Sequence, residues 1–175
     1  MSKKFKVVKD DLNIKGSGMY CFLPYEQLDE HHKGVFKVGM TIGPFEKRTE
    51  QYHTYFPLGV YMVAFLENPT VPKTHTKTSY YLKIEKFIFD SIQSNGGIRI
   101  YSTTRIKNPN EKKEGETEWV YCDVHAINSA FLAAQKMFGG KAHTFSLRKL
   151  NLNKKLREKE KDEPNYVGKI VFNFM

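Results

Sequence analysis

The sequence lacks the features that define several classes of protein. No apolar run approaches the roughly 18 residues of a membrane-spanning helix, so no membrane partner is expected. No apolar segment follows the basic N-terminus, so we also expect no secretory signal. The only two cysteines, Cys21 and Cys122, form no CxxC pair and no zinc-type spacing. This cysteine usage favours a reducing, intracellular compartment, such as the cytoplasm or nucleus.

What the sequence contains is sufficient for one folded domain with a basic surface. Its 175 residues are 40% hydrophobic and 14% aromatic, which excludes a wholly disordered chain. The 28 Lys and Arg residues exceed the 19 Asp and Glu residues, and the net charge is +9. A basic excess favours nucleic acid as a partner, because cations displace counterions from phosphate backbones, although solubility alone also accounts for it. Lys outnumbers Arg, so backbone contact is expected more than base readout.

Hydrophobic periodicity predicts a mixed α/β (α+β) chain of short elements. Alternating apolar positions predict two strands of a hairpin over residues 18–24 and 35–41. Further strands are predicted over residues 60–66, 98–103, 118–122 and 166–174, and a loop over 107–117. Capping signals predict helices from Pro44 to Phe56, from Tyr80 to Ser94 after a Ser79 cap, and from Asp123, as the cap, to Gly139.

The composition changes at Lys141, after which the chain becomes dense in charge. We therefore divide it into a domain over residues 1–140 and a charged C-terminal extension over residues 141–175. The strand predicted near the C-terminus is expected either to extend the sheet or to pair with a second copy, which would make a homodimer.

Glu85 is the charged residue that a purely structural interpretation explains least well. On the predicted helix it lies three or four residues from Tyr81, Leu82, Ile88 and Phe89, in the middle of the apolar face. A carboxylate buried there must be neutralised, paired or bound to a metal. The structural alternatives are a Glu at the edge of that face, or one paired with an Arg, and structural ion pairs outnumber metal sites.

Three further residues carry chemistry. Arg48 flanks the apolar side of its predicted helix, and a half-buried guanidinium suits a phosphate or a carboxylate. Tyr20 and Lys37 share the second face of the predicted hairpin, where a neighbouring ammonium favours the phenolate form of tyrosine. The structural alternatives are a salt bridge of Arg48, with Glu85 for example, and simple solvation of the other two side chains.

These residues together resemble the GIY-YIG endonuclease domain. The resemblance rests on Gly18-Met19-Tyr20, Lys37-Val38-Gly39, Phe45-Glu46-Lys47-Arg48 and the helix that carries Glu85, in that order. It covers residues 18–122 and implies a small, mainly antiparallel three-stranded sheet flanked by helices.

Lys at the start of the second motif is similar to members of a phage and large-virus subgroup, as is the later pair Glu118-Trp119. A protein of this subgroup would act inside a virus-infected host cell. Two departures stand out: Met19 replaces the usual Ile, and the family's late Asn motif has no counterpart here.

The resemblance implies metal-dependent hydrolysis of a DNA phosphodiester bond. In this assignment Glu85 holds one Mg²⁺ or Mn²⁺ ion, and Tyr20 acts as the general base. Lys37 favours the phenolate form of Tyr20 that accepts the proton, and Arg48 binds the scissile phosphate. Two residues would assist binding: Gly39 permits close approach of the backbone, and His53 reaches a phosphate or the bound water.

Two other interpretations stay open. The first is a non-catalytic nucleic-acid-binding module on the same fold, which would bind with salt-sensitive affinity but show no metal-dependent turnover. The second is an accessory domain in which Glu85 and Arg48 form a buried ion pair. Loss of either partner would then destabilise the protein by about 3–5 kcal/mol, with no effect specific to DNA.

Overall fold

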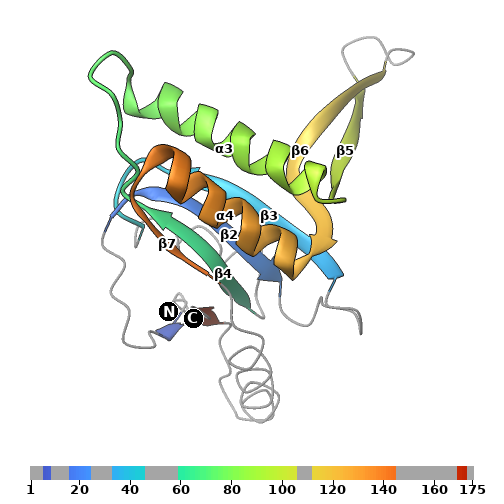
Figure 1. Ribbon diagram of the computed structural model, residues 1–175. Coiled ribbons are helices and arrows are strands. Elements are labelled where there is room, and N and C mark those ends of the chain that lie inside the picture. Colours follow the sequence, from blue (N-terminus) through green and yellow to red (C-terminus); the bar gives the residue numbers. More distant parts are fainter. Residues whose placement is uncertain are drawn as a thin grey trace, which may run out of the picture.

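A computed structural model of the chain describes residues 6–8, 16–24, 33–45, 59–105, 112–144 and 169–172 (Figure 1). In this part of the chain it contains one mixed sheet and two helices, so the predicted α+β class is confirmed. The strands are β1 (Lys6–Val8), β2 (Gly18–Pro24), β3 (Lys33–Thr41), β4 (Gly59–Glu67), β5 (Ile98–Arg105), β6 (Lys112–Asp123), β7 (Lys141–His143) and β8 (Lys169–Phe172). The helices are α3 (Lys77–Ser94) and α4 (Val124–Phe138).

The sheet is larger than the three strands that the resemblance implied, and that expectation is wrong. Eight strands join it in the order β1-β8-β4-β2-β3-β6-β5, with β7 also paired to β4. The strands from β2 to β7 pair antiparallel, whereas β8 runs parallel to both β1 and β4. The core strands could be predicted because they alternate apolar and polar residues, but short edge strands such as β1 and β7 carry too few residues for a pattern to emerge.

The predicted hairpin of β2 and β3 is confirmed, and its register decides which motif residues meet. Tyr20 lies opposite Gly39, and Phe22 lies opposite Lys37. Residues directly opposite each other in an antiparallel pair project from the same face. Tyr20, Gly39 and Lys37 therefore share one face of the sheet, as the sequence predicted.

The two helix starts differ in how well they were predicted. The helix α3 begins at Lys77, because the Thr76 hydroxyl accepts a hydrogen bond from the Ser79 N–H at 3.2 Å. Ser79 was therefore wrong as the cap, and it serves as the third residue of the capped turn. The predicted start of α4 is confirmed, since the Asp123 carboxylate accepts from the His125 N–H at 2.7 Å. Gly139 ends α4 with a φ of +75°, which favours glycine.

The strand β6 is longer than predicted. It begins at Lys112 and pairs with β5 as far as Arg105, so most of the predicted loop over 107–117 is strand. The residues 112–116 are charged apart from one glycine, and a hairpin that extends past the core needs no alternating apolar residues. The sequence pattern therefore did not reveal this part of β6, because its residues are charged and do not alternate with apolar ones. Figure 1 shows this hairpin leaving the rest of the sheet.

The main core lies between the sheet and the two helices, which cover the same face (Figure 1). The sheet supplies alternate residues of its central strands to this core, including Met19, Cys21, Phe36, Val38 and Val120. The residues between them project from the opposite face, because side chains alternate along a strand. On that face Tyr20, Phe22, Phe45 and Phe65 form a buried aromatic cluster with ring centroids 4.7–6.3 Å apart.

The C-terminal extension contributes two strands to the same sheet. Phe65 lies opposite His143 where β7 pairs with β4, and the His143 imidazole contacts the Glu67 carboxylate at 3.0 Å. The strand β8 pairs with β4 and β1 of its own chain, so the predicted strand near the C-terminus extends the sheet. Neither of the two described helices combines the length and apolar character that a membrane span requires.

Candidate active site

Two acidic and two basic side chains on α3, β3, β5 and β6 are close enough to influence one another electrostatically. They are Glu85 on α3, Lys37 on β3, Arg99 on β5 and Glu118 on β6, and we call them the charge cluster. Their electrostatic influence on one another is evident at Glu85, which is affected by all three of the others. The Lys37 ammonium lies 3.1 Å from the Glu118 carboxylate, with 20% and 49% of the two side chains exposed.

The backbone explains why these side chains meet at this point. Lys37 and Trp119 form the last register pair between β3 and β6, so the two strands part beyond it. The register of β5 and β6 also shifts between Arg99 and Tyr101. The Thr117 hydroxyl stabilises this irregular segment, because it donates to the Ile100 carbonyl at 2.7 Å and accepts from the Trp119 N–H at 3.2 Å. An irregularity of this kind re-aims neighbouring side chains.

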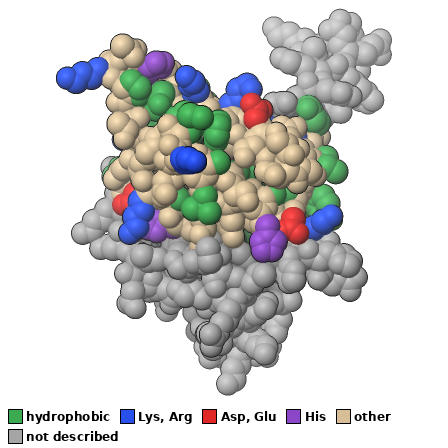
Figure 2. Space-filling model, in the orientation of Figure 1, with side chains coloured by type: hydrophobic (Ala, Val, Ile, Leu, Met, Phe, Trp, Pro, Cys, Tyr) green, Lys and Arg blue, Asp and Glu red, His purple; other side chains and the backbone are tan. Residues whose placement is uncertain are grey.

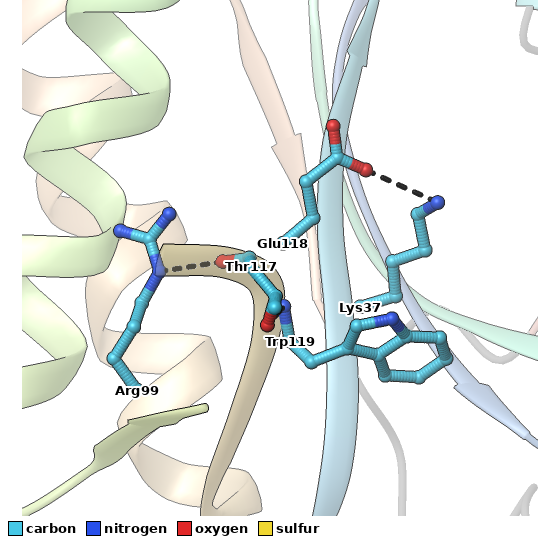
Figure 3. Close-up of polar contacts among 5 residues, drawn as sticks. All are labelled: Lys37, Arg99, Thr117, Glu118 and Trp119. Atoms are coloured by element: carbon cyan, nitrogen blue, oxygen red, sulfur yellow. Dashed lines mark hydrogen bonds and ion pairs between the residues drawn. The ribbon is translucent and has the colours of Figure 1, made fainter. Parts of the chain in front are cut away.

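Arg99 connects the irregular segment to α3 (Figure 3). Its Nε–H donates to the Thr117 carbonyl at 2.7 Å, and its guanidinium carbon lies 3.4 Å from the centroid of the Phe89 ring. A guanidinium stacked on an aromatic ring and bonded to a backbone carbonyl has little rotational freedom. The positive charge of Arg99 is therefore held in place, and it acts to lower the pKa of Glu85.

The surroundings of Glu85 perturb its pKa. Its pKa is raised to about 7, first by burial and then by the negative charge of Glu118. The positive charges of Arg99 and Lys37 act in the opposite direction and lower it. Glu85 is partly buried, and Leu82, expected beside it on the apolar face, is 51% exposed. The other three expected neighbours of Glu85, Tyr81, Ile88 and Phe89, are buried, so Glu85 lies on the buried side of α3 with the exposed Leu82 beside it.

Tyr20 and Gly39, from the first and second motifs, are packed against each other. A Cβ atom on Gly39 would lie 2.5 Å from the Tyr20 hydroxyl and 2.6 Å from its Cζ. Glycine is therefore required here so that the tyrosine ring can cross the neighbouring strand. The Tyr20 side chain has no exposed surface and stacks on Phe22 at 4.7 Å between ring centroids.

The structure brings some of the predicted site residues together and separates others. Lys37 acts electrostatically on Glu85, although like Tyr20 it projects from the face of the sheet away from α3. Tyr20 contacts Gly39, but it lies on the face of the sheet away from α3, the helix that carries Glu85. Arg48 and His53, and the helix predicted from Pro44 to Phe56 except for its first residues, lie outside the residues that the structure describes.

Glu118 and Arg99 were not predicted as site residues. Glu118 did have a signal, since the Glu118-Trp119 pair was part of the family resemblance, but nothing in the sequence placed it beside Glu85. Arg99 had none, because a single arginine on a short edge strand is ordinary, and its position depends on packing against Phe89.

The donor set of the charge cluster suits a hard divalent cation. Among the described residues, no three His, Cys, Asp or Glu side chains come together as a complete metal site. A metal here would therefore rely on Glu85, with Glu118 beside it, and on water. Mg²⁺ is commonly bound in this way, through one or two carboxylates and several retained waters. A carboxylate whose pKa is raised by a second carboxylate would also gain from a cation.

Comparisons of the chain with protein-family models, with curated proteins and with solved structures find no match.

Proposed function

We propose that this protein is a metal-dependent DNA endonuclease of the GIY-YIG type. The observation that carries the proposal is the charge cluster, in which Glu85 has a pKa raised to about 7 beside a second carboxylate and two cations. Strongly perturbed carboxylates occur preferentially at sites of catalysis or metal binding. The net charge of +9 supports a polyanionic substrate.

Each residue of the cluster has a role in this proposal. Glu85 is the metal ligand, with Glu118 as a second carboxylate next to it. When bound, the metal supplies charge stabilisation to the leaving oxygen of the phosphodiester. Lys37, held by Glu118, presents an ammonium to a non-bridging phosphate oxygen. Arg48 contacts the same phosphate in the assignment that the resemblance implies, and Arg99 favours the ionised form of Glu85.

Tyr20 is the general base in the assignment that the resemblance implies, but its side chain is buried on the face of the sheet away from the helix that carries Glu85. Its base function needs contact between the phenol oxygen and the attacking water. The burial of the Tyr20 side chain favours instead a second candidate function, a non-catalytic nucleic-acid-binding module on the same fold. The two candidates differ in turnover, and both predict salt-sensitive binding to DNA.

One experiment separates them. Supercoiled plasmid is incubated with the protein in Mg²⁺ and in EDTA, and DNA binding is measured in parallel over a range of salt concentrations. The endonuclease converts supercoiled plasmid to the nicked form in Mg²⁺ and not in EDTA. Salt-sensitive binding with no nicking in Mg²⁺ or Mn²⁺ would contradict the endonuclease and leave the binding module. If the protein neither nicks nor binds DNA, both candidate functions are wrong.

A further inference from the structure

The face of the sheet away from α3 and α4 is partly exposed over β3, β6 and β5, in contrast to the buried aromatic cluster over β2 and β4. We call this exposed region the outer face. Its position follows from alternation along the strands, since Phe36, Val120 and Cys122 point into the helix-covered core. The residues between and beside them make up the outer face: Lys33, Val35, Lys37, Trp119, Tyr121 and Ile98.

The register places the large side chains of the outer face in rows across the three strands. Val35, Tyr121 and Ile98 lie opposite one another in one row, and Lys37 lies opposite Trp119 in the next. Ile98 is 63% exposed and Tyr121 is 37% exposed. Figure 3 shows the Trp119 ring projecting from β6 to the same side as the Lys37 side chain. Aromatic and aliphatic surface is therefore open to contact beside a lysine of the charge cluster.

The charges on this face are two lysines, each with an acidic neighbour, on a chain with a basic excess. Lys33 is exposed, and along the strand it is about 13 Å from Lys37, given a rise of about 3.3 Å per residue. Asp123, which caps α4, lies opposite Lys33, and Glu118 pairs with Lys37, so a bound phosphate would compete with these carboxylates. The chain as a whole carries a net charge of +9, which attracts a polyanion to any such surface.

We propose that the outer face binds unpaired bases of single-stranded DNA, with Trp119 and Tyr121 as stacking surfaces and Lys33 and Lys37 on the flanking phosphates. Aromatic rings on an open face of a sheet, here the exposed Tyr121 and the partly buried Trp119, can stack bases without reading their sequence. This inference rests on the proposed endonuclease, and it names the substrate class: DNA with an unpaired segment next to the scissile phosphate, such as a branch, flap or frayed end.

Paired bases cannot use this surface in the same way. In a duplex the faces of the bases are stacked on one another, so a flat aromatic surface can reach only the backbone and the groove edges. Stacking of an unpaired base on an aromatic ring is worth about 1–3 kcal/mol, which corresponds to about a 5- to 150-fold change in affinity. A preference of at least about 10-fold for single strands over duplex is therefore expected.

Trp119 gives a direct readout, because it is the one tryptophan in the sequence. The full-length protein is titrated in EDTA, which prevents cleavage, with a 12-nucleotide oligo(dT), with the same length of duplex DNA and with oligo(rU). We expect oligo(dT) to quench the fluorescence of Trp119 and the duplex to do so at least about 10-fold more weakly. No quenching, equal affinity for duplex, or tighter binding of oligo(rU) would overturn the proposal.

Two variants test the surface itself, with affinity measured by the anisotropy of labelled oligo(dT). Tyr121→Ala should weaken binding by about 5- to 150-fold. Lys33→Ala, at an exposed position, should lower the slope of log affinity against log salt by about 0.7. The matched control is Leu132→Ala, since Leu132 is 47% exposed but lies on α4, on the other side of the sheet.

Equal binding by the Tyr121→Ala and Leu132→Ala proteins, with an unchanged salt slope for Lys33→Ala, would also overturn the proposal. The outcome is distinct from that of the endonuclease test. Metal-dependent nicking of plasmid combined with no preference for single strands would leave the proposed function standing and remove this inference alone.

Discussion

Replacing Gly39 by alanine tests the packing of the two motif strands, because Tyr20 lies directly over this glycine. The added Cβ would be 2.5 Å from the Tyr20 hydroxyl, 2.6 Å from Cζ and 2.8 Å from Cε2. Real Cβ atoms do not approach other atoms this closely, so the ring or the strand must move. The ring has little room, since it stacks on Phe22 at 4.7 Å and neighbours Phe45 at 6.3 Å.

The expected cost of this overpacking is about 1–3 kcal/mol of unfolding free energy. In a chain of this length 1 kcal/mol moves the Tm by about 2–4 °C, so the Tm of Gly39→Ala should fall by about 2–12 °C. The assay is thermal unfolding followed by circular dichroism. Gly43→Ala is the matched control, because no atom lies within 4 Å of a Cβ at that exposed position. If Gly39→Ala is as stable as Gly43→Ala, Tyr20 does not lie over Gly39 and the description of the motif strands is wrong.

Three further predictions concern the chemistry of the site. The pKa of Glu85 is about 7 in the folded protein and 4.5 without the fold, so the wild type loses stability as pH rises between these values. Measured in EDTA, the Tm of Glu85→Gln relative to wild type should therefore increase from pH 5 to pH 8, and a constant difference would contradict the burial of the charged form. Tyr20→Phe should lower plasmid nicking by at least about 10²-fold if Tyr20 is the base, whereas an unchanged rate would leave it a core residue. Arg48→Ala should lower nicking by a similar factor while DNA binding in EDTA weakens much less, and a wild-type rate would remove Arg48 from the site.

The parts of the fold that could be predicted are those in which local chemistry and packing agree. The strands β2, β3 and β4 alternate or concentrate apolar residues, and α4 has both a capping Asp123 and a terminating Gly139, so pattern alone located them. The extent of β6 was not predictable, because its outer half pairs with β5 beyond the core and needs no apolar face.

The candidate site also has features that could be predicted from the sequence and features that could not. The position of Glu85 on a mostly apolar helix, and the shared face of Tyr20 and Lys37, follow from the periods of helix and strand. The charge cluster does not, because it depends on the parting of β3 and β6 at Lys37 and on the irregular segment at Thr117. Tertiary packing also sets the exposure of individual residues, so the burial of Tyr20 could not be inferred from its strand alone.

The side of the molecule that α3 and α4 cover provides exposed positions for control substitutions. Figure 2 views this side and shows hydrophobic and charged side chains interspersed over its described residues. Among them, Leu82, Leu132 and Met137 are exposed on α3 and α4. Asp90, paired with Lys86 at 2.6 Å on the surface of α3, is a charged residue of the same helix outside the charge cluster.

The most direct test of the central claim is the rate of plasmid nicking in Mg²⁺ by Glu85→Gln, compared with wild type and with Asp90→Asn. Both substitutions remove one carboxylate from α3 without changing its size. The account predicts that Asp90→Asn nicks at the wild-type rate and that Glu85→Gln, although folded, is slower by about 10²-fold or more. Nicking by Glu85→Gln at the rate of Asp90→Asn would contradict it.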